Sequence, residues 1–208
     1  VFTGAKVIWG YNNVTTNSEY DYVLHGETLC LTRYKGNGGE VIIPECIDEY
    51  EVVDIGDIFY NNTSITFVKI PEGVTKIQSN AFKDCKILMK VELPRTLTLI
   101  GYAAFQGCRS LLEVKIPEKV NCIDEKAFDS CELLKTIVFL GDVEIIDDYA
   151  FSASFALEYI YYQGTMATGE LLRANNYYLG FASWYYYSET EPELNEEDTA
   201  YNGNYWHY

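Results

Sequence analysis

Hydrophobic positions in this chain recur at a fixed spacing of 23 residues, with polar positions between them. A period of this size is typical of a solenoid, in which each repeat forms one coil stacked on the preceding coil. The sequence therefore predicts a solenoid with these inward positions: Ala81-Phe82, Ala104-Phe105, Ala127-Phe128 and Ala150-Phe151; Leu88, Leu111, Leu134 and Leu157; Val91, Val114, Ile137 and Ile160; Ile77, Ile100, Ile123 and Ile146.

Within one repeat, the local pattern predicts two short extended segments and a turn. Val114 and Ile116 alternate with charged residues, which indicates a strand that is buried on one face. Pro117 ends this strand, because proline cannot donate a hydrogen bond to a continuing ladder. A second short extended segment follows around Ile123. A tight, 3₁₀-like turn at Ala127-Phe128 leads to the next strand.

The repeat pattern divides the chain into three parts of one structural domain. Residues 41–163 form the solenoid, with about five rungs of 23 residues and an extra loop at 45–50. Residues 1–40 contain two strand-like segments around His25-Gly26-Glu27, which predicts a β-hairpin-like N-terminal cap. Residues 164–208 form an aromatic C-terminal cap and tail, with a short helix near 167–174 and a strand at 183–187. A run of carboxylates without a basic residue predicts a solvated linker at 188–200, and 202–208 is again aromatic.

Three of the six cysteines share one repeat position, which Asn62 and Ser154 fill in the neighbouring rungs. A position that accepts Cys, Ser or Asn requires a small side chain, and a free cysteine packs as a small hydrophobic residue. We therefore expect packing thiols at Cys85, Cys108 and Cys131, while pairing of the other cysteines stays open. Metal binding is not expected, because no C-x-x-C spacing or companion histidine is present.

The charge of the chain restricts its partners. The formal net charge is −16 and the sequence pI is about 4.4. Such a surface repels phosphate backbones and anionic lipids, so nucleic-acid and membrane-surface binding are not expected. No apolar run of about 18 residues is present, so membrane insertion is not expected either. On the basis of charge alone, proteins with basic patches, divalent cations and neutral glycans stay open as partners, and we expect a monomer.

The sequence contains no recognisable catalytic constellation. His25 and His207 are its only histidines, and both lie outside the regular rungs. No G-x-S-x-G, phosphate-loop or H-E-x-x-H motif is present. We therefore expect no enzyme activity, no cofactor and no metal.

The rungs follow the pattern L-x-x-V-x-I-P-x-x-V-x-x-I-x-x-x-A-F-x-x-C, which resembles the BspA-type leucine-rich repeats of surface proteins from host-associated bacteria. The resemblance covers residues 41–163. It implies a leucine-rich-repeat solenoid, a right-handed β/α superhelix built mostly of short parallel β-strands with 3₁₀ or short helical turns. It also implies display outside the cell and adhesion or ligand binding. The chain opens on Val1-Phe2-Thr3 without methionine, so we expect a processed or truncated product. Together with the resemblance, this implies a secreted or cell-surface protein whose signal peptide has been removed or lies outside this sequence.

Outward strand positions are the candidate binding surface. Equivalent residues of stacked rungs lie about 4.8 Å apart, so these positions form rows in which opposite charges alternate across rungs. One interpretation is a solvated face that neutralises itself. The other is a ligand surface, most distinct where Tyr159 and Tyr161 join Val138. The two rows are Lys69, Glu92, Lys115, Val138, Tyr161 and Phe67, Lys90, Glu113, Thr136, Tyr159.

From these observations we predict a non-catalytic binding or adhesion scaffold. Its solenoid would present a rigid face to a protein of a host or a neighbouring cell. A first alternative is a glycan-binding module that uses C-terminal aromatic residues, including Trp184 and Trp206. A second alternative is a passive spacer within a larger surface protein.

Overall fold

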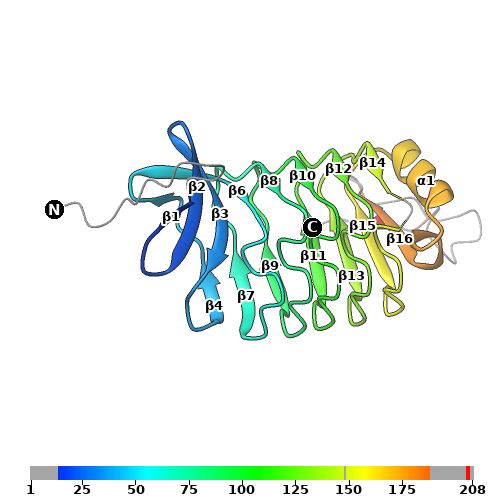
Figure 1. Ribbon diagram of the computed structural model, residues 1–208. Coiled ribbons are helices and arrows are strands. Elements are labelled where there is room, and N and C mark those ends of the chain that lie inside the picture. Colours follow the sequence, from blue (N-terminus) through cyan, green and yellow to red (C-terminus); the bar gives the residue numbers. More distant parts are fainter. Residues whose placement is uncertain (1–13, 148, 188–204, 207–208) are drawn as a thin grey trace, which may run out of the picture.

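The computed structural model describes residues 14–147, 149–187 and 205–206, and shows an elongated stack of coils (Figure 1). The N-terminal strands lie at one end of the stack and helix α1 at the other. The acidic linker expected at 188–200 lies outside the described residues. The aromatic segment at 202–208 lies outside them as well, except for Tyr205–Trp206.

One side of the coils carries a row of parallel strands, which we call the main strands. They belong to two sheets, and Figure 1 shows β9 beside β11 where the two meet. The row contains β4 (Gly39–Ile42), β7 (Ile65–Lys69), β9 (Lys90–Glu92), β11 (Glu113–Ile116), β13 (Thr136–Phe139), β15 (Tyr159–Tyr162), β16 (Ser183–Tyr187) and β17 (Tyr205–Trp206).

A third sheet runs along another side of the coils and contains the second extended segment of each rung. After two longer strands, it continues as two-residue parallel strands. Its parallel strands are β3 (Thr28–Tyr34), β6 (Tyr50–Ile55), β8 (Lys76–Ile77), β10 (Leu99–Ile100), β12 (Cys122–Ile123) and β14 (Ile145–Ile146).

The strands pair in register with the sequence period, which confirms the predicted solenoid. Ile77 pairs with Ile100, and Ile100 with Ile123, so each partner lies one full repeat further along the chain. On the main strands, Ile137 pairs with Ile160 at the same step. Trp184 follows Ile160 in this series and pairs with it, although a helix lies between the two strands in the sequence. Trp184 lies one position later than the period of 23 residues predicts.

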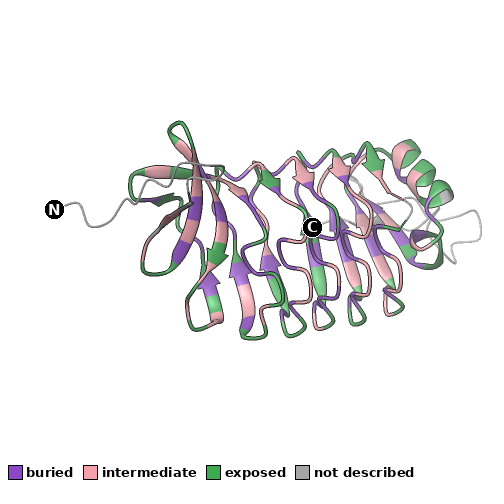
Figure 2. Ribbon diagram, in the orientation of Figure 1, coloured by how far each residue is buried: buried purple, intermediate pink, exposed green. Residues whose placement is uncertain are grey.

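The phenylalanines of successive turns form a continuous buried column. Neighbouring ring centroids from Phe82 to Phe151 lie 4.8 to 5.2 Å apart, and the ring planes differ by 2° to 5°. Phe59 extends the column by one rung at 5.0 Å. Figure 2 shows that buried residues recur at matching positions from coil to coil. Like side chains therefore stack on like throughout the solenoid.

The turns that carry these rings are held by backbone hydrogen bonds of the i to i+3 type, as in the bond from Cys85 N to Phe82 O. The three repeat cysteines are free and buried, which confirms them as packing thiols. Each donates its thiol to the carbonyl oxygen 26 residues earlier, at 3.0 to 3.3 Å. Ser154 makes the equivalent bond to Phe128 O at 2.8 Å, so hydroxyl and thiol are interchangeable at this position.

The N-terminal end is covered by antiparallel strands. β1 (Val14–Thr16) pairs with β2 (Tyr20–His25), and β2 pairs with β3 across a turn at Gly26. The segment 45–50, expected as a loop, is instead a small hairpin in which β5 (Cys46–Ile47) pairs antiparallel with β6. The hydroxyl of Tyr22 donates to the Asp48 carboxylate of this hairpin at 2.7 Å.

At the C-terminal end, α1 (Met166–Asn175) follows β15 and is capped by Thr165, whose side chain accepts a hydrogen bond from Thr168 N. A short 3₁₀ helix, η1 (Leu179–Phe181), then leads into β16. Trp184 of β16 is 1% exposed, and its indole N–H donates to Leu179 O at 3.0 Å. This tryptophan is therefore part of the core.

Candidate strand-face binding site

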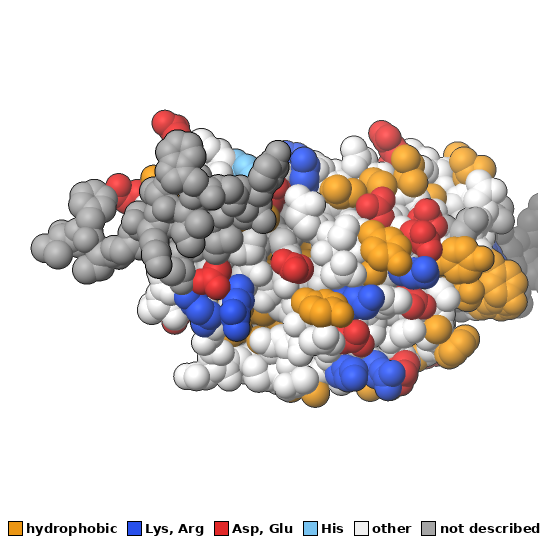
Figure 3. Space-filling view, in the orientation of Figure 1, with side chains coloured by type: hydrophobic (Ala, Val, Ile, Leu, Met, Phe, Trp, Pro, Cys, Tyr) orange, Lys and Arg blue, Asp and Glu red, His pale blue; other side chains and the backbone are white. Residues whose placement is uncertain are grey.

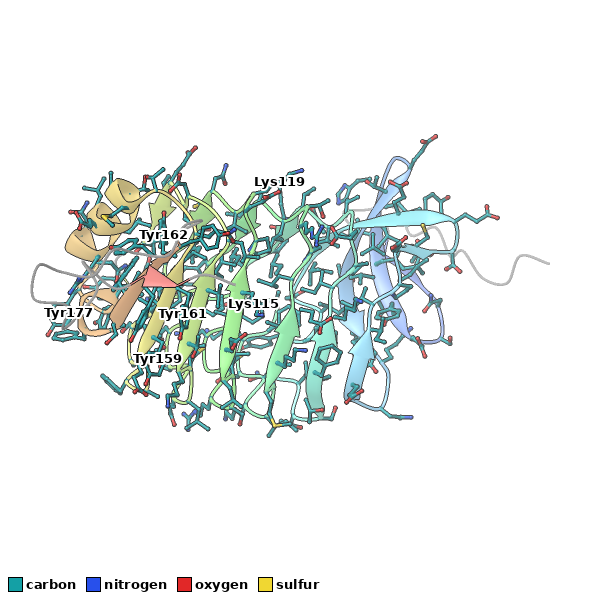
Figure 4. The ribbon with its side chains drawn as sticks, turned by 180° about the vertical axis from the view of Figure 1, so that it is seen from behind. Lys115, Lys119, Tyr159, Tyr161, Tyr162 and Tyr177 are labelled. Carbon is teal, nitrogen blue, oxygen red and sulfur yellow. The ribbon has the colours of Figure 1, made fainter. Side chains whose placement is uncertain are left out.

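We use the term strand face for the outward side of the main strands. The ten residues predicted for this surface all belong to β7, β9, β11, β13 or β15, and the parallel pairing aligns them in two rows. Figure 4 shows Lys115, Tyr159 and Tyr161 on this side of the solenoid. Four of them are exposed: Lys69, Lys90, Glu113 and Lys115. Five are half-buried: Phe67, Glu92, Thr136, Tyr159 and Tyr161. Val138 is buried.

Val138 corrects the prediction that it forms an exposed apolar point of the face. Val138 is only 8% exposed, although it lies between Lys115 and Tyr161 in the row. The longer side chains on both sides leave little of a valine accessible. Val138 can support its neighbours, but it offers almost no contact area to a partner.

Among the described residues, the charged members of the two rows form their ion pairs along each strand, and not across rungs as the sequence rows suggested. Lys90 Nζ lies 2.7 Å from Glu92 Oε1 on β9, and Lys115 Nζ lies 3.7 Å from Glu113 Oε1 on β11. Residues two apart on a strand point to the same side, which places these partners within reach of each other. The hydrogen bond from Lys90 lowers the pKa of the Glu92 carboxyl below its ordinary value, and Lys69 on β7 adds to this effect.

Phe67 and Lys90 form a contact that crosses rungs. The two residues are register partners on β7 and β9, and Lys90 Nζ lies 5.4 Å from the centroid of the Phe67 ring. Lys90 thus contacts both an aromatic ring and a carboxylate. This half of the strand face is charged, but its opposite charges largely neutralise one another.

The other half of the strand face is aromatic. Tyr161 stacks on Tyr185 of β16 with centroids 5.2 Å apart and planes 24° apart, and Tyr159 lies 6.3 Å from the same ring. Lys135 Nζ lies 5.4 Å from the Tyr159 centroid and 2.9 Å from Glu158 Oε2. Hydrogen bonds from Tyr159 and Lys135 lower the pKa of the Glu158 carboxyl. All three tyrosines are half-buried and keep part of each ring accessible.

Tyr185 belongs to this surface but is absent from the rows derived from the sequence. It pairs with Tyr161 one position beyond a full repeat, so a row extended by the exact period misses it. The alternation of Trp184, Tyr185 and Tyr186 was the signal that could have identified it. Tyr185 is the half-buried member of the three, and its two neighbours are buried.

A groove of about 1250 Å³ follows the charged half of the strand face. It runs over β9 and β11 and extends to the turns that follow these strands. Exposed Met89 and Leu112 contribute apolar surface. Its lining includes Lys69, Lys90, Glu92, Glu113 and Lys115 of the predicted set, together with Met89, Leu112, Pro94 and Pro117.

Two negative findings apply to the part of the chain that the structure describes. In residues 14–147, 149–187 and 205–206, His, Cys, Asp and Glu side chains form no cluster of three or more that could hold a metal ion. Within the same residues, no helix combines the length and hydrophobicity needed to cross a bilayer.

The stacked parallel strands, the repeat-matched register and the buried phenylalanine column define a leucine-rich-repeat solenoid. The profile of the BspA type leucine rich repeat region matches residues 53–170 in six copies, which is more than half of the chain. The chain therefore belongs to the BspA-type leucine-rich repeat family, as the sequence resemblance suggested.

Solved structures of bacterial leucine-rich repeat proteins are similar to this chain. The Treponema pallidum (T. pallidum) leucine-rich repeat protein is 31% identical over 71% of each chain, with a TM-score of 0.67. One from Bacteroides capillosus is 27% identical over 73% of this chain and 99% of its own, with a TM-score of 0.53. A leucine-rich cell surface protein from Faecalibacterium prausnitzii is 25% identical over 72% of this chain and 54% of its own, with a TM-score of 0.50. A search of curated protein sequences found no match.

Proposed function

We propose that this protein is a non-catalytic, extracellular binding scaffold whose strand face binds a protein partner. The observation that carries this proposal is the cluster of Tyr159, Tyr161 and Tyr185, which places three partly accessible rings on adjacent parallel strands. Tyrosine is among the residues that contribute most to protein interfaces. Because in-register strands fix the backbone beneath the rings, little conformational entropy is lost when a partner binds.

The charged half of the strand face contributes specificity in this proposal. The in-strand pairs Lys90–Glu92 and Lys115–Glu113 are exposed, so their own contribution to stability is small. A partner whose charges complement the alternating Lys and Glu side chains would align along the groove in one position. The tyrosines would supply most of the affinity, and the ion pairs would determine which partner fits.

An extracellular location is supported by similarity. The Faecalibacterium prausnitzii structure of similar fold is described as that of a leucine-rich cell surface protein. The family assignment of this chain agrees with such a location. The partner in this proposal is accordingly a protein at the surface of a host or neighbouring cell.

The proposal is tested by screening immobilised matrix and cell-surface proteins with the purified chain by biolayer interferometry. A binder found in this way is then measured against the double variant Tyr159→Ala/Tyr161→Ala, for which we expect at least tenfold weaker binding. The matched control is Tyr149→Ala/Tyr177→Ala, which removes two tyrosines that are 52% and 72% exposed and lie outside the strand face. Equal affinity of both double variants for the partner would reject the strand face as the site.

The two alternatives predicted from the sequence, a glycan-binding module and a passive spacer, make different demands on the surface. Trp184 would not contribute to a glycan platform, because its side chain is buried in the core, but other C-terminal aromatic residues such as Tyr177 and Phe181 are exposed. The side chain of Trp206 lies outside the described residues. A passive spacer would bind nothing through the strand face, so a screen without a saturable binder would favour that function.

A further inference from the structure

A second, smaller cleft lies where the N-terminal strands meet the first turn of the solenoid. Its volume is about 440 Å³, which falls within the range of about 300–1,000 Å³ that is usual for small-molecule sites. It is separate from the strand-face groove and shares no residue with it. The end of β3 and the turn after β6 line this cleft with Thr32, Arg33, Tyr34, Asp57, Ile58, Tyr60, Asn61, Asn62, Thr63 and Ser64.

The turn that forms this cleft departs from the repeat. Residues 60–64 read Tyr-Asn-Asn-Thr-Ser, whereas the equivalent turns read Lys-Asp-Cys-Lys-Ile at 83–87 and Asp-Ser-Cys-Glu-Leu at 129–133. The equivalence is structural, because Asn61 N bonds to Lys83 O as Asp84 N bonds to Gln106 O in the next coil. The packing cysteine is thus replaced by an amide, and every residue of the turn has a polar group.

Asn62 is held in one orientation by its own turn. Its Oδ1 atom accepts hydrogen bonds from Ser64 N at 2.8 Å, Ser64 Oγ at 3.0 Å and Ile65 N at 3.0 Å. These three bonds occupy the oxygen and distinguish it from the amide nitrogen. The amide nitrogen makes no hydrogen bond within the described part of the chain, so its two N–H groups are available as fixed donors.

The other polar groups of the cleft also have unused hydrogen-bonding capacity. Within the described residues, no hydrogen bond or ion pair involves the Arg33 guanidinium, the Asp57 carboxylate or the Tyr60 hydroxyl. Arg33 supplies donors in one plane, and Asp57 supplies acceptors. Tyr60 is 50% exposed and lines the same cleft, so it adds an accessible aromatic ring to these polar groups. Backbone bonds from Tyr60 N to Asp57 O and from Tyr34 N to Ile58 O fix the turn against β3.

An accessible aromatic ring beside the oriented Asn62 amide and the charged groups of Arg33 and Asp57 is suited to a sugar ring. The ring offers apolar C–H groups on its faces and hydroxyls around its edge, and each hydroxyl both donates and accepts. Arg33 and Asp57 carry opposite charges, so the cleft has no excess of either sign. An anionic ligand would also meet the field of a protein with net charge −16, which a neutral ligand does not.

We propose that this cleft binds a neutral saccharide unit of one or two rings. Tyr60 would stack on the sugar face, while Arg33, Asp57 and Asn62 would hydrogen-bond its hydroxyls. This proposal does not depend on the strand face, and either one can fail without the other. It also differs from a glycan platform at the C-terminal end, because the cleft lies at the opposite end of the solenoid.

The test uses the full chain and a panel of neutral methyl glycosides and disaccharides, built from glucose, galactose, mannose, fucose and N-acetylglucosamine. Binding is followed by ¹H–¹⁵N NMR, in which the Asn62 side-chain amide reports on the cleft directly. We expect saturable shifts of this signal with at least one sugar, and at least tenfold weaker binding by Tyr60→Ala and by Arg33→Ala. The matched control is Tyr102→Ala, which removes another exposed tyrosine outside the cleft and leaves binding unchanged.

Thermal unfolding of each variant shows whether it is folded, and Tyr60→Phe provides a second variant that keeps the ring. We expect Tyr60→Phe to bind within a few-fold of the original chain, because the stacking surface remains. The proposal is overturned if no sugar of the panel shifts the Asn62 amide. It is also overturned if Tyr60→Ala and Tyr102→Ala weaken sugar binding equally.

Discussion

Phe105 and Phe128 stack with ring centroids 5.1 Å apart and planes that differ by 4°. Both rings are fully buried, and each is also stacked on the other side, by Phe82 and Phe151 respectively. A truncation at Phe105 therefore leaves a cavity between the neighbouring turns. These turns cannot approach each other to close the cavity without disturbing the register of their strands. The stability of the solenoid depends on this column.

We predict that Phe105→Ala lowers the free energy of unfolding by about 3–5 kcal/mol, as expected for a large-to-small change in a close-packed core. Lys90→Ala serves as the comparison, because it removes an exposed side chain and one exposed ion pair. We expect it to change stability by less than about 1 kcal/mol. Urea unfolding of both variants measures the two values, and similar losses would contradict the assignment of inward and outward positions.

The cysteines should differ sharply in reactivity. Cys46 is exposed, whereas Cys85, Cys108 and Cys131 are buried. Burial raises the pKa of the Cys85 thiol to about 12, and the thiolate is the reactive species. At pH 8 we expect a disulfide reagent to modify Cys46 rapidly, and the three repeat cysteines only as fast as the protein unfolds. Mass spectrometry after timed quenching gives the order, and early labelling of Cys108 would contradict it.

Stability should fall in alkaline solution. Burial raises the pKa of the Cys85 thiol from about 9 to about 12. The pKa of the Tyr20 hydroxyl rises from about 10 to about 12, mainly because the group is buried and also because the charge of Glu19 is near. The folded state then holds these protons more tightly than the unfolded state. Their contribution is complete below the unfolded pKa values and is lost as the pH rises through 9 to 12.

Urea unfolding at a series of pH values tests this dependence. Each group with a raised pKa lowers the free energy of unfolding by about 1.4 kcal/mol per pH unit between its unfolded and its folded pKa. The variant Cys85→Ser/Cys108→Ser/Cys131→Ser removes the thiols but keeps a hydroxyl of the type that Ser154 places in the same position. We expect a shallower decline in this variant between pH 9 and 10. A stability that stays constant up to pH 11 would show that burial does not shift these groups.

Gly107 gives a backbone test of the turns. Its φ is +72°, and an added Cβ would lie 2.8 Å from Asp84 Oδ1. Ser130 and Ala153 take similar angles at the same repeat position, with φ of 58° and 53°. A side chain is thus tolerated there with strain, and we predict that Gly107→Ala costs about 1–2 kcal/mol. The reverse change Ala153→Gly should cost less, since glycine relieves this strain, and a larger cost for Ala153→Gly in thermal unfolding would contradict the explanation.

Much of the fold could be predicted from the sequence because each buried position repeats. The column from Phe82 to Phe151 and the cysteines at 85, 108 and 131 each have one role in every coil, so their period alone specifies the stacking. The segment 45–50 breaks the period, and its antiparallel pairing depends on the left-handed φ angles of Asp48 and Glu49. The pattern gave no indication of this hairpin.

The surface was less predictable, because it depends on side-chain contacts that a period does not specify. Lys90 reaches Glu92 on its own strand, and the length of a lysine side chain permits either that pairing or one across rungs. Val138 has an outward position yet is buried by its larger neighbours. Predicting Tyr185 as part of the strand face would have required knowledge of the one-position shift before β16. Predicting the cleft at Tyr60 would have required knowledge of the contact between β3 and the first turn.

Register is tested most directly by cross-linking Lys69→Cys with Glu92→Cys, in a chain that also carries Cys46→Ser. Lys69 and Glu92 are partners on adjacent parallel strands, so their Cα atoms lie within the range that a disulfide spans. Lys69→Cys with Lys115→Cys provides the control, since β9 lies between β7 and β11, the strands that carry these positions (Figure 1). Figure 3 shows hydrophobic side chains from the middle of the view to the α1 end, with charged side chains among them. The stacked solenoid predicts rapid oxidation of the 69/92 pair and none of the 69/115 pair within one molecule, and equal oxidation of both pairs would contradict it.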